Sequence, residues 1–321
     1  MAALKIVGQG VTRKATIEME KPLLKWVGGK SQIIDDVMAL FPAQMTNYHE
    51  PFVGGGSVLL ALLSHRKAGK IAVAGTVFAS DLNPNLIALY KNVQTQPQAL
   101  IESLRLLATG FSQATVGPTA TVNRAAATAD EAKTSQESYY FWIRKRFNGM
   151  SATDRATCLG SAMLLFLNKT CFRGLYREGP NGFNVPFGNY KSPQILNEAH
   201  ILAVSELIQG VVFMERGFTE SLQGVGPGDF VYMDPPYAQE SATSFVGYTA
   251  AGFSAETHTT LFAAAAALQA RGAKMLLSNA DVPVVRQAFP APAFETKIIS
   301  CRRAINSTSP GARTNEVLIR R

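Results

Sequence analysis

Short apolar runs alternate with stretches of helical periodicity along most of this chain. The clearest runs cover 77–80, 211–214, 230–233 and 274–277, and a helical pattern at 195–209 precedes the second. Three of the runs end in polar residues, namely Asp81, Asp234 and the pair Ser278-Asn279. This alternation predicts an α/β fold with a doubly wound, mostly parallel sheet, in which ligands bind beyond the carboxyl ends of the strands. We therefore expect these polar residues to share one edge of the sheet.

The middle of the chain departs from this alternation. Residues 112–136 are small, polar and aperiodic, and they predict a flexible surface insertion. The two helical patterns that follow cover 138–147 and 157–168. The next segment, 169–194, is dense in Gly, Asn, Pro, Arg and aromatic residues and has no regular period. Near the end, apolar runs at 296–300 and 316–319 flank a stretch rich in Gly, Ser, Pro and Asn, which predicts an antiparallel hairpin.

Length and composition fit an intracellular globular protein. With 321 residues, 47% of them apolar, the chain can form one large α/β domain or two ordinary ones. No apolar run reaches the roughly 20 residues of a membrane span, and the N-terminal stretch lacks the apolar core of a signal peptide. The three cysteines cannot all pair, which favours a reducing, cytoplasmic setting. No cluster has zinc-ligand spacing, so we expect no metal.

The chain is basic, and the charge is unevenly distributed. Its formal net charge is +8 and its pI is about 9.4. Basic residues gather at 144–146, in 169–191, and at Arg302-Arg303 together with Arg313, Arg320 and Arg321. Such clusters suit a polyanion such as nucleic acid. The charge alone is equally compatible with a solvated basic surface that binds no polyanion.

The run at 230–233 leads into Asp234-Pro235-Pro236-Tyr237, which has the chemistry of a clamp for a planar amine. The Asp234 carboxylate can accept a hydrogen from the amine. Proline fixes φ and removes a backbone donor, so that neighbouring carbonyls can be aimed at a ligand. The Tyr237 ring offers a flat face on which a base or amide can stack. A tight turn after a buried strand is the structural alternative.

A glycine-rich loop, Pro51-Phe52-Val53-Gly54-Gly55-Gly56-Ser57, precedes an apolar helical run at 58–63. Glycines at a strand-to-helix turn let the backbone approach a ligand closely. The loop lacks the third glycine of the dinucleotide fingerprint, because position 59 is Leu, and Gly29-Lys30-Ser31 lacks the first glycine of a P-loop, because position 24 is Leu. Asp81 then ends the next strand, where a carboxylate can bind ribose hydroxyls. A plain structural turn remains open at this point.

Taken in order, six motifs resemble those of the Dam-type DNA adenine-N6 methyltransferases, the alpha-ordered, D12 class. The motifs are 25–30 (KWVGGK), 52–56 (FVGGG), Asp81, 168–177 (NKTCFRGLYR), 183–188 (FNVPFG) and 234–237 (DPPY). The resemblance spans about 22–320. It implies a Rossmann-like methyltransferase fold in which a mostly helical target-recognition domain at 96–200 separates two parts of the catalytic domain, 1–95 and 201–321. It also implies S-adenosyl-L-methionine (SAM) as methyl donor and S-adenosyl-L-homocysteine as product.

The resemblance assigns roles residue by residue. Its cofactor-binding residues are Trp26, Lys30, Phe52, Gly54, Gly56, Asp81 and Asp234. Its catalytic residues are Asp234, Pro235 and Tyr237. Its DNA-binding residues are Lys25, Arg173, Leu175, Arg177, Lys191, Arg302 and Arg303. The adenine would be flipped out of the duplex. The Asp234 carboxylate and the Pro235 carbonyl would then accept the N6 hydrogens while Tyr237 stacks on the ring.

The target site and the partners are less constrained. Arg177 matches a family arginine that reads guanine, a common specific contact. Arg173 stands where the GATC enzymes usually carry Asn, so the site is either GATC or a related or longer sequence. We expect a monomer that acts on double-stranded cellular or phage DNA, with a cognate restriction endonuclease as a further candidate partner. Two competing hypotheses are a methyltransferase that acts on an RNA base or a protein glutamine, and a DNA-binding module without catalysis.

Overall fold

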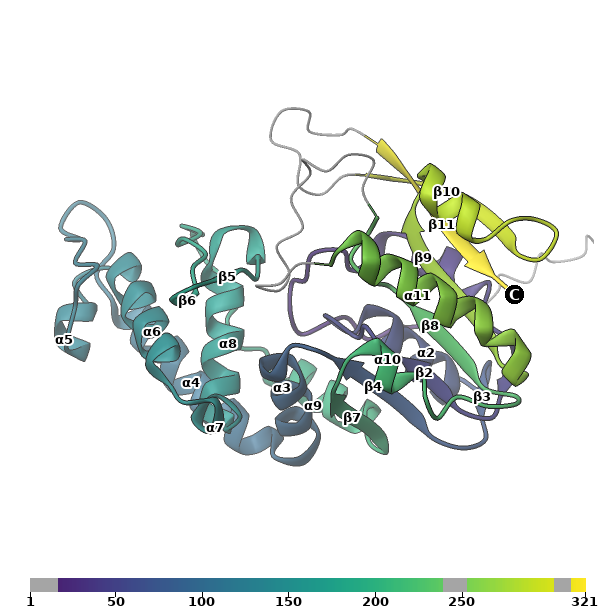
Figure 1. Cartoon of the computed structure of the whole chain (residues 1–321). Coiled ribbons are helices and arrows are strands. Elements are labelled where there is room, and N and C mark those ends of the chain that lie inside the picture. Colours follow the sequence, from purple (N-terminus) through teal and green to yellow (C-terminus); the bar gives the residue numbers. More distant parts are fainter. Residues whose placement is uncertain (1–16, 239–252, 303–312) are drawn as a thin grey trace, which may run out of the picture.

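A seven-stranded sheet forms the centre of one half of the molecule, on the right in Figure 1. The computed structural model describes residues 17–238, 253–302 and 313–321. From edge to edge the strands are β10 (Glu295–Arg302), β11 (Arg313–Arg320), β9 (Lys274–Ala280), β8 (Phe230–Met233), β2 (Tyr48–Glu50), β4 (Val77–Asp81) and β7 (Val211–Glu215). The pairs from β9 to β7 are parallel, and β11 runs antiparallel to both of its neighbours. The predicted fold class and the C-terminal hairpin are therefore confirmed.

The central strand β2 was not predicted, because its sequence, Tyr48-His49-Glu50, does not look like a buried strand. All three residues are buried. Most of their polar side-chain atoms are paired: the Tyr48 hydroxyl donates to Glu50 Oε2 at 2.7 Å, and His49 Nε2 lies 3.2 Å from Asp229 Oδ2. Among the described residues, His49 Nδ1 is buried without a hydrogen-bond partner. Paired polar groups lose little on burial. Hydrophobic patterning therefore missed the strand that leads into the glycine loop.

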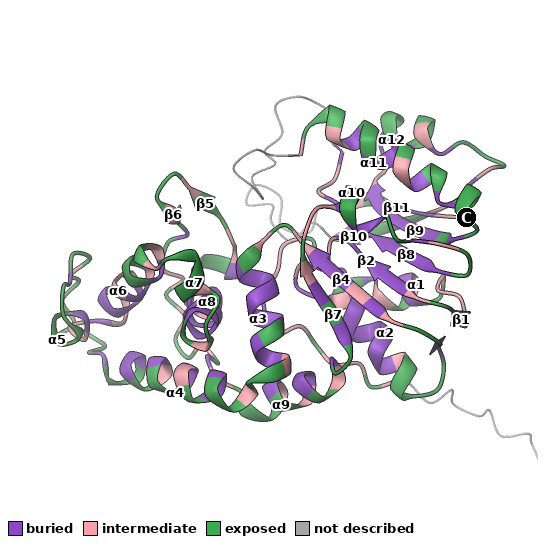
Figure 2. Ribbon diagram, turned by 60° about the horizontal axis from the view of Figure 1, so that its bottom comes forward, coloured by how far each residue is buried: buried purple, intermediate pink, exposed green. Residues whose placement is uncertain are grey.

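Helices cover both faces of the sheet. They are α1 (Ile34–Met38), α2 (Ser57–Lys67), α3 (Pro84–Thr95), α9 (Glu198–Leu207), α10 (Phe218–Ser221), α11 (Ala255–Ala267) and α12 (Pro283–Ala288), with 3-10 turns at Lys30–Gln32 and Gln269–Arg271. Neighbouring residues of β8 point to opposite sides, so that Val231 packs with α11 and α12 while Tyr232 packs with α1 and α2. Figure 2 shows buried positions along the strands and on the helices that flank them. Two further strand pairs are short: β1 (Gln44–Met45) with β3 (Ala72–Val73), and β5 (Glu178–Gly179) with β6 (Gly182–Phe183).

The middle of the chain forms a helical unit beside the β7 edge of the sheet (Figure 1). Its helices are α4 (Pro97–Gln113), α5 (Ala129–Ala132), α6 (Gln136–Gly149), α7 (Ala152–Arg155) and α8 (Cys158–Thr170), followed by a 3-10 turn, Phe172–Gly174. Helix α8 is buried along 160–168 because apolar residues cover all of its faces. The unit and one face of the sheet share a single hydrophobic core. Both helices expected at 138–147 and 157–168 are confirmed.

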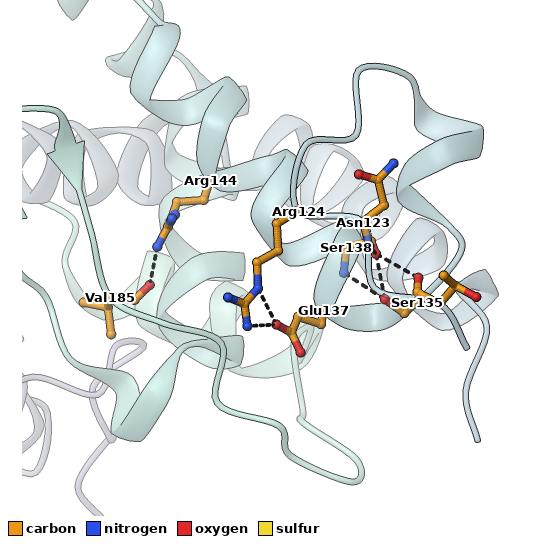
Figure 3. A network of polar contacts seen from close by, with 8 residues as sticks. Asn123, Arg124, Ser135, Glu137, Ser138, Arg144 and Val185 are labelled. Atoms are coloured by element: carbon orange, nitrogen blue, oxygen red, sulfur yellow. Dashed lines mark hydrogen bonds and ion pairs between the residues drawn. The ribbon is translucent and has the colours of Figure 1, made fainter. Parts of the chain in front are cut away.

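The segment 112–136 folds back onto α6. Backbone hydrogen bonds join Thr115 N to Lys133 O and Thr121 N to Thr134 O, at 2.9 and 3.0 Å. As Figure 3 shows, Arg124 pairs with Glu137 of α6 at 2.6 Å. The flexibility expected from its composition stays a prediction; the backbone bonds tie the segment to itself, and Arg124 ties it to α6.

In the described ranges, no helix is long and apolar enough to cross a membrane.

Candidate active site

The carboxyl edge of the sheet brings together the residues that the sequence singled out. Strand β8 ends at Met233 and presents Asp234, strand β4 ends in Asp81, and β2 leads into the glycine loop at 51–57. Because β2 lies between β8 and β4, the loop sits between the two carboxylates. The expectation that Asp81 and Asp234 share one edge of the sheet is confirmed.

Lys30 and Asp234 form an ion pair at the centre of this edge. Their Nζ and Oδ2 atoms are 2.7 Å apart, and the side chains are 3% and 18% exposed. The ammonium also donates to the Gly28 carbonyl at 2.6 Å, and the Lys30 amide donates to Ser57 Oγ at 3.0 Å. Burial raises the pKa of the Asp234 carboxyl to about 6, and Lys30 opposes that rise. Asp234 is therefore mainly a carboxylate at neutral pH, held by one cation.

The glycine loop is fastened to Asp81. Asp81 Oδ2 accepts a hydrogen bond from the Gly54 amide at 3.0 Å, and Asp81 Oδ1 accepts one from the Asn83 amide at 2.9 Å. Burial raises the pKa of the Asp81 carboxyl. Gly56 has φ 75°, and a Cβ there would lie 2.6 Å from the Tyr90 hydroxyl, which leaves room only for glycine. Each Asp81 oxygen retains a lone pair with which it could accept from a ribose hydroxyl.

Two aromatic side chains border the loop. Trp26 lies against it, since a Cβ on Gly55 would come within 2.6 Å of the Trp26 Cβ. The indole is partly buried and packs on the Tyr176 ring with centroids 5.1 Å apart. Phe52, at the start of the loop, stacks on Phe218 of α10 at 5.7 Å. The loop therefore has an aromatic wall on either side.

The turn after β8 is held at three points by other elements. The Tyr237 hydroxyl donates to Glu316 Oε2 at 2.8 Å, and the Ala238 amide donates to Asn279 Oδ1 at 3.0 Å. The His258 ring nitrogen Nε2 lies 3.0 Å from the Pro236 carbonyl oxygen. Lys30 Nζ lies 5.0 Å from the centroid of the Tyr237 ring. The turn is thus a fixed structure rather than a free loop.

The segment expected to read DNA is attached to the site through Asn168. The Asn168 side chain accepts from the Lys25 amide at 2.8 Å and donates to the carbonyls of Lys25 and Gly174, at 2.8 and 3.0 Å. The Lys25 ammonium lies over the Tyr190 ring at 4.8 Å. Asn168 therefore ties Lys25, five residues before Lys30, to the start of the recognition segment.

The candidate DNA-binding side chains differ in their surroundings. Arg177 is exposed on the β5–β6 hairpin, where Nε donates to Asn184 Oδ1 at 2.6 Å. Arg173 is exposed and has φ 57°, a conformation that costs a residue other than glycine about 1–3 kcal/mol. Lys191 is exposed, whereas Leu175 is half-buried against the core. Arg302 ends β10, and Arg303 lies outside the described residues.

Sequence reasoning missed Glu50 and the roles of Asn279, His258 and Glu316. Glu50 is 3% exposed, and burial raises the pKa of its carboxyl to about 8 although it accepts a hydrogen bond from Tyr48. A charged residue directly before the glycine loop was the available signal. The other three act through contacts between distant segments, for which one sequence carries no signal. Within the described ranges, no group of three or more His, Cys, Asp or Glu side chains could hold a metal ion.

Comparison with known proteins gives consistent matches over most of the chain. Residues 26–305 match the family model described as D12 class N6 adenine-specific DNA methyltransferase. The type II methyltransferase M.MjaIII of Methanocaldococcus jannaschii is 34% identical over 89% of this chain and 93% of its own. The type II methyltransferase M1.LlaDCHI of Lactococcus lactis is 30% identical over 84% of each chain. A DNA adenine methylase of Vibrio cholerae is 28% identical over 92% of this chain and 93% of its own.

Proposed function

This chain belongs to the D12 class of N6 adenine-specific DNA methyltransferases, and on that premise we propose how its own residues carry out the reaction. The Asp234-Pro235-Pro236-Tyr237 turn seats an adenine flipped out of double-stranded DNA. The observation that carries this assignment is the Lys30–Asp234 pair, 2.7 Å apart at the edge where the glycine loop and the turn meet. It holds a carboxylate beside the place where a cofactor and a base can meet.

The residues around the glycine loop fit the polar ends of SAM. The Asp81 carboxylate can accept from ribose hydroxyls, and the Lys30 ammonium can bind a carboxylate. Trp26 and Phe52 provide apolar walls, while Gly54 and Gly56 let the backbone come close. When bound, SAM supplies an electrophilic methyl group, and S-adenosyl-L-homocysteine is released.

Adenine N6 is a poor nucleophile because its lone pair is delocalised into the ring. The Asp234 carboxylate accepts one N6 hydrogen and the Pro235 carbonyl accepts the other, which favours a pyramidal nitrogen with a localised lone pair. Tyr237 stacks on the base and fixes its plane. Positioning and electrostatics then lower the barrier. After transfer, Asp234 is the base within reach of the proton that the amine must lose.

The 168–191 segment supplies the DNA-reading surface. Arg177 is proposed to read guanine by a bidentate contact, with Asn184 aligning its guanidinium. Lys25, Arg173, Leu175 and Lys191, with Arg302 and Arg303 from the C-terminal hairpin, complete the proposed interface. The target is either GATC or a related or longer site. We propose a monomer that works on intracellular DNA, and the type II names of two relatives suggest a cognate restriction endonuclease as a partner.

Transfer of tritiated methyl from SAM to unmethylated duplex DNA tests the assignment. Asp234→Ala should abolish transfer while DNA binding stays near normal. Asp36→Ala, which breaks a partly exposed pair with Lys297, is the matched control and should be fully active. Near-normal turnover by Asp234→Ala would contradict the proposed role. Expression in a methylation-free host, followed by single-molecule sequencing, maps the target site.

A further inference from the structure

Glu316 touches the catalytic turn from the far end of the chain. It lies on β11, where it is the register partner of Ala280, the last residue of β9. Its Oε2 accepts from the Tyr237 hydroxyl at 2.8 Å, across 79 positions of sequence. Because Glu316 pairs with the last residue of β9, it lies at the carboxyl edge of that strand. There its carboxylate is within hydrogen-bonding distance of the Tyr237 hydroxyl, at the end of the turn. Family motifs at the turn and at the glycine loop do not include it.

The Tyr237 ring is constrained from two directions. The Lys30 ammonium lies 5.0 Å from the ring centroid and occupies one face. The hydroxyl is tied to Glu316 at the distal end of the ring. A tyrosine ring has two rotatable torsions, so a cation on one face and an anchor at the hydroxyl together fix its plane. A stacked base would therefore have to use the face opposite Lys30.

The Glu316 carboxylate has an electrostatic cost at this place. Its negative charge helps to raise the pKa of the Asp234 carboxyl, which opposes the ionised form that the reaction requires. It also helps to raise the pKa of the Tyr237 hydroxyl, so that this hydroxyl stays protonated and remains a donor. The hydrogen bond that the Tyr237 hydroxyl donates to Glu316 offsets part of this cost. A charged acceptor makes a stronger hydrogen bond than a neutral one.

We propose that Glu316 is a positioning residue, whose carboxylate holds the Tyr237 ring in the plane that receives the target adenine. It does not touch the substrate, and its positioning effect passes through the Tyr237 hydroxyl. This inference rests on the proposed role of Tyr237 as the stacking platform. It assigns to the C-terminal hairpin a part in preparing the site, beyond closing the sheet.

A double-mutant cycle tests the inference, with kcat for methyl transfer measured at saturating SAM and DNA. Tyr237→Phe keeps the ring and removes the hydroxyl, whereas Glu316→Ala removes the anchor. Each should lower kcat about tenfold, and the double variant should be no slower than either, because both break one hydrogen bond. An additive loss of about a hundredfold would overturn the inference. So would a Tyr237→Phe enzyme with the kcat of the wild type.

Further variants separate positioning from folding. Glu316→Gln keeps an oxygen acceptor and should recover most of the kcat lost in Glu316→Ala, and a folded Gln variant no better than Ala would also overturn the inference. SAM affinity, measured by calorimetry, should change less than about twofold in Glu316→Ala and in Glu316→Gln, since Glu316 acts on the Tyr237 ring that receives the base. Glu295→Ala is the matched control and should keep the wild-type kcat, because the exposed Glu295 side chain on β10 pairs only with Arg320 among the described salt bridges. Near-normal turnover by Asp234→Ala would refute the proposed active site itself, a result distinct from an additive cycle.

Discussion

In the proposed mechanism, which requires an ionised Asp234, the ion pair between Lys30 and Asp234 sets the pH range of activity, and replacing Lys30 with methionine should move that range upward. Asp234 must be ionised to accept a hydrogen from the adenine amine. Burial raises the pKa of its carboxyl to about 6, and the ammonium 2.7 Å away keeps that pKa from rising further. Methionine has a similar length but no charge. Its introduction leaves the burial and removes the opposing cation, so the pKa of Asp234 must rise.

The size of the effect follows from the contact distance. A cation in direct contact typically shifts the pKa of a carboxyl by about 1–3 pH units, or roughly 1.4–4 kcal/mol. In the wild type, with a pKa of about 6, roughly nine-tenths of Asp234 is ionised at pH 7. In Lys30→Met the ionised fraction at pH 7 should be about half or less. Activity of the variant should therefore recover only in alkaline buffer.

The measurement is kcat/KM for SAM between pH 5 and pH 9 at a DNA concentration well below its KM, because this ratio then reports ionisations of the free enzyme. The wild type should lose activity below about pH 6, and Lys30→Met should lose it at a higher pH. Weaker SAM binding by the variant lowers the whole profile but does not move the acid limb. Lys297→Met, which breaks the Lys297–Asp36 pair, should leave the limb in place. An unmoved limb in Lys30→Met would refute the reasoning.

Three other predictions follow from single residues. Gly56→Ala places a Cβ at a residue with φ 75°, 2.6 Å from the Tyr90 hydroxyl, so the free energy of unfolding measured in urea should fall by about 1–3 kcal/mol. Gly149→Ala, whose Cβ would meet open space, is the control and should be nearly neutral. Glu50 has a pKa of about 8 in the fold and ionises more readily in the unfolded chain, so its contribution to the free energy of unfolding falls as pH rises from about 5 to 8. Glu50→Gln should reduce that fall by up to about 1.4 kcal/mol per pH unit, and equal slopes in urea unfolding would contradict this. Arg177→Ala should weaken or relax recognition at one base pair by about 1–3 kcal/mol, and single-molecule methylation maps that do not change would count against its role.

The strands and the helical unit could be predicted because their signal is local. The runs that became β4, β7, β8 and β9 are apolar, and this pattern follows directly from burial in a parallel sheet. Strand β2 could not be found in this way. Tyr48 and Glu50 hydrogen-bond to each other, and His49 Nε2 contacts Asp229, so the burial of these residues depends on partners that lie elsewhere in the chain or two positions away.

The candidate site was predictable in its parts but not in its arrangement. The turn at 234–237 and the glycine loop have local chemistry that the sequence displays: a carboxylate before two prolines, and glycines at a strand-to-helix turn. The contacts to Lys30 and Glu316 were not visible, because they join segments far apart in sequence. One sequence gives no measure of such distances.

The sequence alone determined the family, the order of the motifs and the edge of the sheet at which they meet, since these depend on residue type and local backbone preference. Only the tertiary structure decided which groups are charged and what holds them. Burial raises the pKa of Asp234 and Glu50, and one ammonium at 2.7 Å keeps Asp234 ionised. The physical reason is that desolvation and Coulomb interactions depend on distance in space, which chain connectivity does not specify.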